Sequence, residues 1–132
     1  MKNNPYLINL SSIGSSSLGY ITVAEGMENI PFEIKRVYWT YFTPNDVERG
    51  NHAHKKLEQV IVAVSGVIKF SLEDIKGNMI EFVLDSPSKG LYIPSMYWRT
   101  IKFSHNAVLL CLASQHYDEN DYIRSLNLFR KK

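Results

Sequence analysis

Two histidines stand one residue apart in the stretch Arg49–Gln59, which runs directly into the β-branched segment Val60–Val64. The β-branched content predicts that the whole stretch forms one strand. Alternate side chains of a strand share a face, so His52, His54 and Glu58 are expected to point together into a small barrel. A single strand histidine is more often packed or solvated, but this group is suited to holding a metal ion or moving protons.

The pattern His-x-His-x-x-x-Glu, followed by Gly66, resembles the first signature of the cupin superfamily of small β-barrels. A second signature is partly matched by Gly90–Pro94, followed by Trp98 and Arg99. The resemblance implies a cupin (jelly-roll) barrel with its functional residues on the inner wall. A polar-lined barrel mouth also suits a ligand pocket.

The second signature bears on the metal question. Metal-binding cupins carry a further histidine after the proline, whereas Arg99 is the nearest match here. A guanidinium is permanently cationic, cannot ligate a metal and opposes a divalent ion in the same cavity. We therefore interpret the site as free of metal and of any cofactor, with the histidines used for acid–base work. The alternative is a third ligand from His105 or His116.

The bulk composition limits the other classes of function. A chain of 132 residues is long enough for one domain with its own core. The net charge of +2 is scattered, which argues against nucleic-acid binding. The single cysteine, Cys111, lies in an apolar run, so we expect a buried thiol, no intrachain disulfide and a cytoplasmic location. Neither a signal peptide nor a membrane-length apolar run is apparent.

Short β-like runs separated by turn residues extend along the chain and predict an all-β sandwich or barrel. Beside the histidine strand, we expect strands at 7–10, 19–24, 34–42, 67–72, 79–84, 91–94, 97–103 and 107–113. The serine-rich segment 11–17 is expected to be a flexible connector. Only 121–129 is expected to form a helix, and a short one.

A set of further stretches closely resembles the sugar-nucleotide 3,4-ketoisomerases of the cupin superfamily, over about residues 19–129. These stretches are 30–32, 34–38, 49–56, 85–87, 90–92 and 117–124. The resemblance implies a substrate, dTDP-4-keto-6-deoxy-glucose, whose keto group moves from carbon 4 to carbon 3 through an enediol. It also implies a place in deoxysugar biosynthesis for lipopolysaccharide O-antigens or S-layer glycans. The implied assembly is a homodimer that exchanges an N-terminal strand within residues 1–10.

The resemblance gives roles to individual residues. His52 matches the family histidine that we assign as the base, and His54 is its partner or the second proton carrier, although these two roles could be exchanged. Imidazole suits the task because its ordinary pKa is about 6.5. Tyr38 is a candidate proton shuttle or oxyanion donor, and an ordinary core aromatic is the alternative.

The substrate-binding residues expected from the sequence carry cationic or amide groups. Arg36 and Arg49 could grip the diphosphate bidentately, unless they form structural ion pairs. Arg99 and Gln59 complete the expected binding set. A sugar 3,5-epimerase and a non-catalytic sugar-nucleotide-binding module are the alternative functions.

The configuration of the product is indicated by the second signature. Relatives that form the galacto product tend to carry Trp-His there, and those that form the gluco product carry Trp-Arg. Trp98 and Arg99 therefore favour dTDP-3-keto-6-deoxy-glucose. At Leu18 this chain carries neither the arginine nor the tyrosine that distinguishes the two kinds.

Because Arg99 occupies the position of a cupin metal ligand, we predict that turnover survives exhaustive treatment with a chelator. The measurement is the isomerisation rate before and after dialysis against the chelator, with the metal content of each sample determined. A stoichiometric zinc, iron or manganese ion whose removal abolishes turnover would contradict this prediction.

Overall fold

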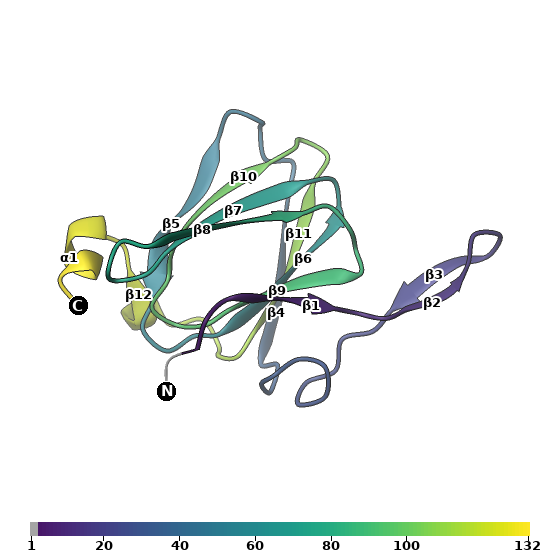
Figure 1. Cartoon of the computed structure of the whole chain (residues 1–132), viewed down its shortest axis with the longest axis horizontal. Helices are drawn as coiled ribbons and strands as arrows, with labels where there is room; N and C mark the ends of the chain where they lie inside the picture. The colour runs from purple at the N-terminus through teal and green to yellow at the C-terminus, as the bar shows by residue number, and fades with distance from the viewer. Residues whose placement is uncertain (1–2) are drawn as a thin grey trace.

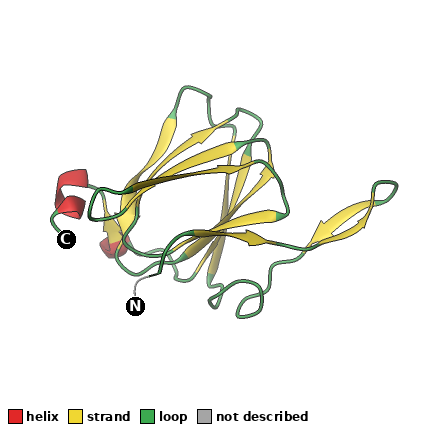
Figure 2. Ribbon diagram, in the orientation of Figure 1, coloured by secondary structure: helices red, strands yellow, loops and turns green. Residues whose placement is uncertain are grey.

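The computed structural model describes residues 3–132 and consists of two five-stranded antiparallel sheets packed face to face, with a two-stranded hairpin projecting from them (Figure 1). The first sheet has the order β1-β9-β6-β11-β4 and the second β12-β5-β10-β7-β8. This arrangement confirms the expected all-β, cupin-like fold with a short C-terminal helix (Figure 2).

The strands of the first sheet are β1 (Tyr6–Asn9), β9 (Lys89–Ile93), β6 (Gln59–Ser65), β11 (Val108–Ala113) and β4 (Arg36–Tyr41). Those of the second sheet are β12 (Tyr122–Ile123), β5 (Glu48–His54), β10 (Trp98–Phe103), β7 (Ile68–Glu73) and β8 (Met79–Leu84). The hairpin is formed by β2 (Ser12–Ser15) and β3 (Gly19–Thr22), and the helices are the 3-10 turn η1 (Glu119–Asp121) and α1 (Leu126–Arg130).

The main core lies between the two sheets and is formed by alternate residues of their strands. Ile61 and Ala63 enter it from β6, and Phe70 and Leu72 enter it from β7. Period-two burial of this kind places the side chains at neighbouring strand positions on opposite faces of a sheet. A residue at the core-facing register but with a polar side chain is therefore held inside the barrel.

The expectation of one continuous strand from Arg49 to Val64 is wrong. β5 ends at His54, and β6 begins at Gln59 in the other sheet, so the chain crosses between layers at residues 55–58. The crossing shifts the alternation: Ile61 faces the core, whereas Val60 and Val62 face the outer side of the first sheet. The sequence pattern did not reveal this break, because His52, His54 and Glu58 stand at even spacing on both sides of it.

Two other expected elements also differ from the structure. The segment expected as a flexible connector, 11–17, contains β2, which pairs with β3 from Ser12↔Thr22 to Ser15↔Gly19. The segment 121–129 holds the end of η1, β12 and most of α1, so the helix begins only at Leu126. Serine-rich composition therefore did not exclude a strand here.

α1 closes one end of the second sheet. Phe129 is fully buried and packs in a cluster with Ala53, Trp98 and Ile123, on the outer side of β5 and β10. Arg130 donates two hydrogen bonds to the Glu73 carboxylate, at 2.7 and 3.0 Å. The helix thus braces the strand that carries both histidines. Within residues 3–132, neither helix has the length or apolar content of a membrane-spanning helix.

The N-terminal strand β1 lies on β9 of its own chain, with Tyr6 opposite Tyr92. The element that extends away from the barrel is the β2–β3 hairpin, at the far end of the molecule from α1 (Figure 1). Pairing inside one chain neither includes nor excludes an exchange between two copies, so the exchange of the N-terminal strand remains a prediction.

Candidate active site

A bulge in β5 sets the position of the first histidine. His52 lies opposite Arg99 and Gly50 lies opposite Thr100, so Asn51 is an extra residue in the strand. Gly50 and Asn51 both have positive φ angles, 88° and 57°. A Cβ atom at Gly50 would stand 2.8 Å from the carbonyl oxygen of Arg99, so a side chain at this position would collide with the neighbouring strand. Bulges of this kind redirect the side chains that follow them.

His52 lines an internal cavity between the two sheets. Its Nδ1 lies 3.0 Å from the carbonyl oxygen of Gly50, and because a carbonyl can only accept, Nδ1 carries the proton. Nε2 is therefore the basic nitrogen. Burial, followed by the charge of Arg99, lowers the pKa of His52 to about 4, so the ring is neutral at physiological pH. The geometry gives a proton acceptor of fixed tautomer.

His54 is close to His52 but lies outside the residues that line the cavity. The two rings are 4.9 Å apart at an interplanar angle of 83°, which confirms the expectation that they point to the same side. His54 is only 1% exposed. Burial, followed by the charge of Arg99, lowers its pKa to about 2, so this ring is also neutral. The structure thus distinguishes two histidines that the sequence could not.

Gln59 takes the place expected for Glu58. Its buried side-chain amide donates to the Tyr38 hydroxyl at 3.1 Å and to the Cys111 sulfur at 3.3 Å. Tyr38 reaches this cavity from β4, and burial of its hydroxyl raises its pKa above the ordinary value. The Glu58 carboxylate instead accepts a hydrogen bond from Tyr92 at 2.5 Å, away from both histidines. Glu58 therefore does not belong to the site.

Arg99 forms the cationic wall of the cavity. Its side chain is 2% exposed, and its guanidinium donates to the side-chain oxygen of Gln59 and to the carbonyl oxygen of Tyr97. Within residues 3–132 it forms no ion pair with a carboxylate, and its Nε has no hydrogen-bond partner. Burial of a cation without a counter-ion is unfavourable in free energy, so this guanidinium is suited to bind a negatively charged group of a ligand.

The two arginines expected to bind diphosphate lie in different surroundings. Arg49 lines the cavity together with His52, Tyr38, Gln59 and Arg99. Arg36 is stacked against the rings of Tyr38 and Tyr117, at 5.5 and 5.7 Å from the ring centroids, and its Nε is buried without a partner. Neither is in an ion pair among the described residues.

Sequence reasoning assigned no role to Tyr122 and Asp121. The Tyr122 ring lies 5.0 Å from His52 and 4.4 Å from His54, and Arg124 stacks over it at 4.1 Å. β12 pairs Tyr122 with His54. The only signal was that both residues belong to the stretch 117–124, which carried part of the family resemblance.

The alternative metal ligands do not join the two histidines. His105 Nδ1 lies 3.3 Å from the carbonyl oxygen of Thr43, and its ring stacks on Phe42, beyond the end of β4. His116 lines a separate surface hollow with Lys55 and Lys56. Within residues 3–132, no group of three or more His, Cys, Asp or Glu side chains is arranged to hold a metal ion.

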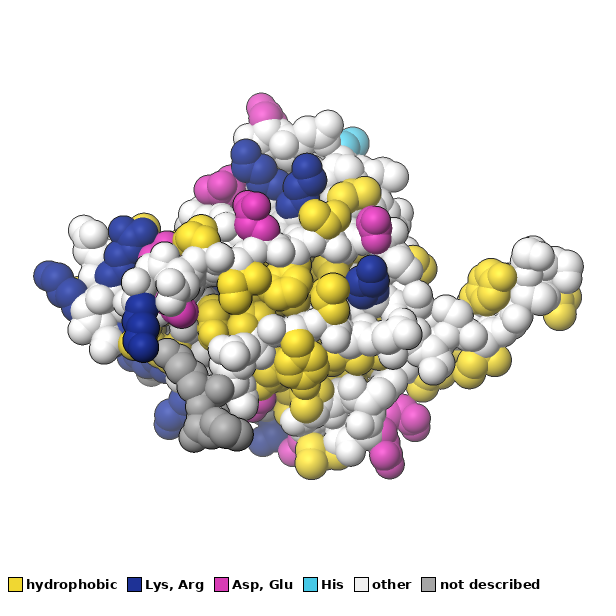
Figure 3. Space-filling view, in the orientation of Figure 1, with side chains coloured by type: hydrophobic (Ala, Val, Ile, Leu, Met, Phe, Trp, Pro, Cys, Tyr) yellow, Lys and Arg dark blue, Asp and Glu magenta, His cyan; other side chains and the backbone are white. Residues whose placement is uncertain are grey.

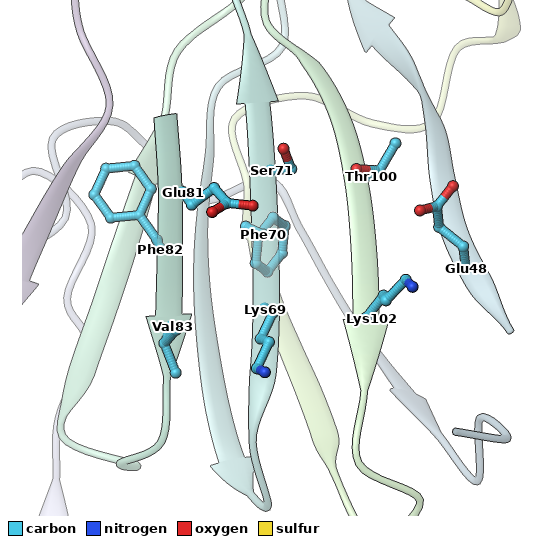
Figure 4. Close-up of a pocket in the computed structure, with 9 residues that line it drawn as sticks. All are labelled: Glu48, Lys69, Phe70, Ser71, Glu81, Phe82, Val83, Thr100 and Lys102. Carbon is cyan, nitrogen blue, oxygen red and sulfur yellow. The ribbon is translucent and has the colours of Figure 1, made fainter. Parts of the chain in front are cut away.

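Another surface hollow lies on the outer face of the second sheet (Figure 4). It is lined by Glu48, Lys69, Phe70, Ser71, Glu81, Phe82, Val83, Thr100 and Lys102. It contains no histidine or tyrosine, and its charged side chains are two lysines, Lys69 and Lys102, on the adjacent strands β7 and β10, flanked by Glu48 on β5 and Glu81 on β8. We interpret it as a solvated sheet face with no role in the chemistry.

Comparison with known proteins identifies the family of this chain. The family described as FdtA, WxcM-like, C-terminal, matches residues 3–132. A TDP-4-oxo-6-deoxy-alpha-D-glucose-3,4-oxoisomerase from Aneurinibacillus thermoaerophilus is 47% identical over 117 residues, which cover 87% of this chain and 83% of that protein. A mutant of the 3,4-ketoisomerase QdtA from Thermoanaerobacterium thermosaccharolyticum, solved in complex with TDP-4-keto-6-deoxyglucose, superposes with a TM-score of 0.93. That structure is 39% identical and covers 99% of this chain and 94% of its own.

Two solved enzymes from Campylobacter jejuni differ in the sugar that names them. The TDP-quinovose 3,4-ketoisomerase WlaRB is 41% identical with a TM-score of 0.92, covering 99% of this chain and all of its own. The TDP-fucose-3,4-ketoisomerase WlaRA is 32% identical with a TM-score of 0.90, covering 98% and 95%. The chain therefore belongs to the FdtA/WxcM-like family of cupin-like sugar-nucleotide 3,4-ketoisomerases, and it is an isomerase.

Proposed function

We propose that this enzyme converts TDP-4-keto-6-deoxyglucose to TDP-3-keto-6-deoxyglucose by moving protons through an enediol. The observation that carries the proposal is the meeting, in one cavity, of a neutral imidazole with a fixed tautomer and a buried cation that lacks a counter-ion. The first is suited to accept a proton from carbon, and the second to stabilise the charge that develops. The relatives named for this reaction support the choice of substrate.

The proposed reaction begins at carbon 3, whose proton is acidified by the neighbouring 4-ketone. Nε2 of His52 accepts this proton, and the electron pair of the broken bond moves to the oxygen on carbon 4 as an enediolate. That oxygen then gains a proton, the 3-hydroxyl loses one, and carbon 4 is protonated. The net change exchanges a ketone and an alcohol between two carbons, so no electron acceptor is needed.

Arg99 and Tyr38 are assigned to the oxygen atoms of this sequence. The Arg99 guanidinium stabilises the enediolate, and its contact with Gln59 keeps it aimed while the cavity is desolvated. Tyr38 carries a proton between the two substrate oxygens, because its raised pKa keeps the hydroxyl protonated and able to donate. Removal of one such donor typically costs about 10²–10³ in kcat.

The diphosphate is assigned to Arg36, whose guanidinium lies beside Tyr38 and Tyr117 and has no carboxylate partner in the described chain. Arg49 lines the cavity itself, and so its assigned role is to contact the sugar. A planar guanidinium can hold two phosphate oxygens at once, which lysine cannot do.

The gluco configuration of the product is proposed from Arg99. A guanidinium cannot readily deliver a proton, so the proton at carbon 4 must come from the His52 side or through Tyr38. The higher identity to the TDP-quinovose enzyme than to the TDP-fucose enzyme supports this choice, since quinovose has the gluco configuration. The product would supply a 3-aminotransferase in the cytoplasm and serve O-antigen or S-layer glycans.

A homodimer is proposed from two apolar surfaces that one chain leaves exposed. Val37, Trp39 and Tyr41 form an outward stripe on the edge strand β4, and Trp39 is 60% exposed. The β2–β3 hairpin carries Ile13, Leu18, Tyr20 and Ile21, all exposed, and its apolar side chains stand clear of the barrel in Figure 3. A second copy that covers both would bury an unpaired sheet edge.

Incubation with TDP-4-keto-6-deoxyglucose in deuterated water is expected to give a 3-ketone with deuterium at carbon 4 in the gluco configuration. The measurement is NMR of the product, trapped by a coupled 3-aminotransferase. A 3-amino-3,6-dideoxygalactose derivative would contradict the argument from Arg99. Deuterium at carbon 5 would indicate an epimerase, and no exchange would leave only binding.

Substitution His52→Asn is expected to lower kcat by about 10²–10⁴, because an amide cannot accept the proton from carbon. His54→Asn is also expected to impair turnover badly. Both variants should keep the wild-type circular dichroism spectrum and the Kd for TDP. His105→Asn, which lies away from the cavity, is the matched control and should keep wild-type kcat. Wild-type kcat in the His52 and His54 variants would exclude the mechanism.

The lowered pKa of His52 predicts the acid limb of kcat/KM. The base is competent when neutral, so activity should persist as pH falls below 6.5 and be lost only near the pKa of about 4. Tryptophan fluorescence at each pH separates this loss from acid unfolding. An acid limb near 6.5 with a folded enzyme would show that His52 is not desolvated or is not the base.

Light scattering at micromolar concentration is expected to give the mass of a dimer. Trp39→Glu should shift the distribution toward monomer, because it places a charge in the apolar stripe on β4. Met79→Glu, an exposed apolar position on β8, is the matched control and should leave the dimer intact. A wild-type monomer with full activity would contradict the proposed assembly.

A further inference from the structure

The carboxylate of Asp121 lies where the crossing at residues 55–57 meets the histidine strand. Asp121 is 8% exposed. Its Oδ1 accepts from the backbone N–H of Lys56 at 2.8 Å, and its Oδ2 accepts from that of Leu57 at 3.2 Å. Its backbone carbonyl accepts from the N–H of Lys55 at 2.9 Å. Three consecutive amides of the crossing therefore end on one residue.

The same carboxylate also approaches His54. Oδ2 of Asp121 lies 3.3 Å from Nδ1 of His54, a close contact whose geometry is not that of a hydrogen bond. A deprotonated Nδ1 would turn its lone pair toward a negatively charged oxygen, which is unfavourable. The proton is therefore favoured on Nδ1. Nε2, which is buried and has no partner in the described chain, is then the unprotonated nitrogen.

His54 in turn packs against the base. Its ring contacts His52 edge-on, and the ring of Tyr122, the residue after Asp121, lies over both imidazoles. Because the three rings are in contact and close-packed side chains have few other positions available, a shift of the His54 or Tyr122 ring would also move the ring of His52. Asp121 thus reaches His52 by two routes: through the imidazole of His54 and through the backbone of Tyr122.

We propose that Asp121 is a positioning residue for the isomerisation: it fixes the tautomer and orientation of His54, and through His54 and Tyr122 it holds the ring of the base His52. The catalytic part of this inference rests on the proposed function, whereas the tautomer does not. The surroundings of His54 agree with this proposal, because burial, followed by the charge of Arg99, keeps the pKa of His54 low and the ring neutral. A neutral ring needs a neighbour to select its tautomer.

The first experiment is ¹⁵N–¹H NMR of the imidazole nitrogens in the wild-type enzyme, with His54 assigned by comparison with His54→Asn. The expected result is a protonated Nδ1 and an unprotonated Nε2 on His54. A His54 ring with the proton on Nε2 would overturn the proposal. This measurement requires neither a substrate nor a variant of Asp121, so it holds even where Asp121→Asn fails to fold.

The second experiment compares Asp121→Asn, His54→Asn and the double variant. Asp121→Asn is expected to lower kcat by roughly 10- to 100-fold with little change in KM, as for loss of a group that orients a reacting residue. If Asp121 acts through His54, the double variant should lose little more than His54→Asn alone. The proposal would be overturned if the fold-losses in kcat of the two single variants multiply in the double variant and the His54 tautomer is unchanged in Asp121→Asn. Asp121 would then only stabilise the crossing at residues 55–57.

Glu73→Gln is the matched control. Glu73 is also a buried carboxylate, but it holds Arg130 and contacts neither histidine. The control should lower the Tm while kcat and the His54 tautomer remain those of the wild type. If the wild type has the Nδ1–H tautomer and loses it in Asp121→Asn, but does not isomerise the TDP-sugar, the positioning role stands and the proposed function fails.

Discussion

The burial of the Arg99 guanidinium is the interaction on which the rest of the site depends. Moving an ion out of water costs on the order of several kcal/mol even after the protein relaxes, and no carboxylate in the described chain offsets that cost here. Gln59 and the carbonyl oxygen of Tyr97 hold the group in place without neutralising it. The remaining positive field acts on everything else in the cavity.

Burial, followed by that field, accounts for the state of both histidines. Together they lower the pKa of His52 and of His54, so both imidazoles are uncharged at physiological pH. An uncharged base beside a fixed cation is the arrangement that proton removal next to a ketone requires, because negative charge appears on oxygen as the proton leaves carbon. The same cation would oppose a divalent metal, which agrees with the proposed use of this cupin-like scaffold for proton transfer.

The fold supplies the positions through two departures from regular sheet. The bulge at Gly50 and Asn51 aims His52 and provides the carbonyl that fixes its tautomer. The crossing at 55–58 then carries the chain from one sheet to the other, which brings Gln59 into the cavity and removes Glu58 from it. Both features interrupt the regular hydrogen bonding between strands. Both lie next to the proposed catalytic residues, and such irregularities often occur beside active sites.

The class of the fold and the nearness of His52 to His54 could be predicted from the sequence, because they follow from local β-propensity and period-two alternation. The ketoisomerase family was indicated by the resemblance of several stretches along the chain. The sequence could not determine which histidine faces the cavity, or that Glu58 is excluded from the cavity that the expected Gln59 lines. Those outcomes depend on where the chain leaves one sheet for the other, at residues 55–58, and the even spacing of His52, His54 and Glu58 gives no sign of that point. Only the tertiary structure decided them, since the crossing is held by Asp121, a residue that is distant in sequence and adjacent in space.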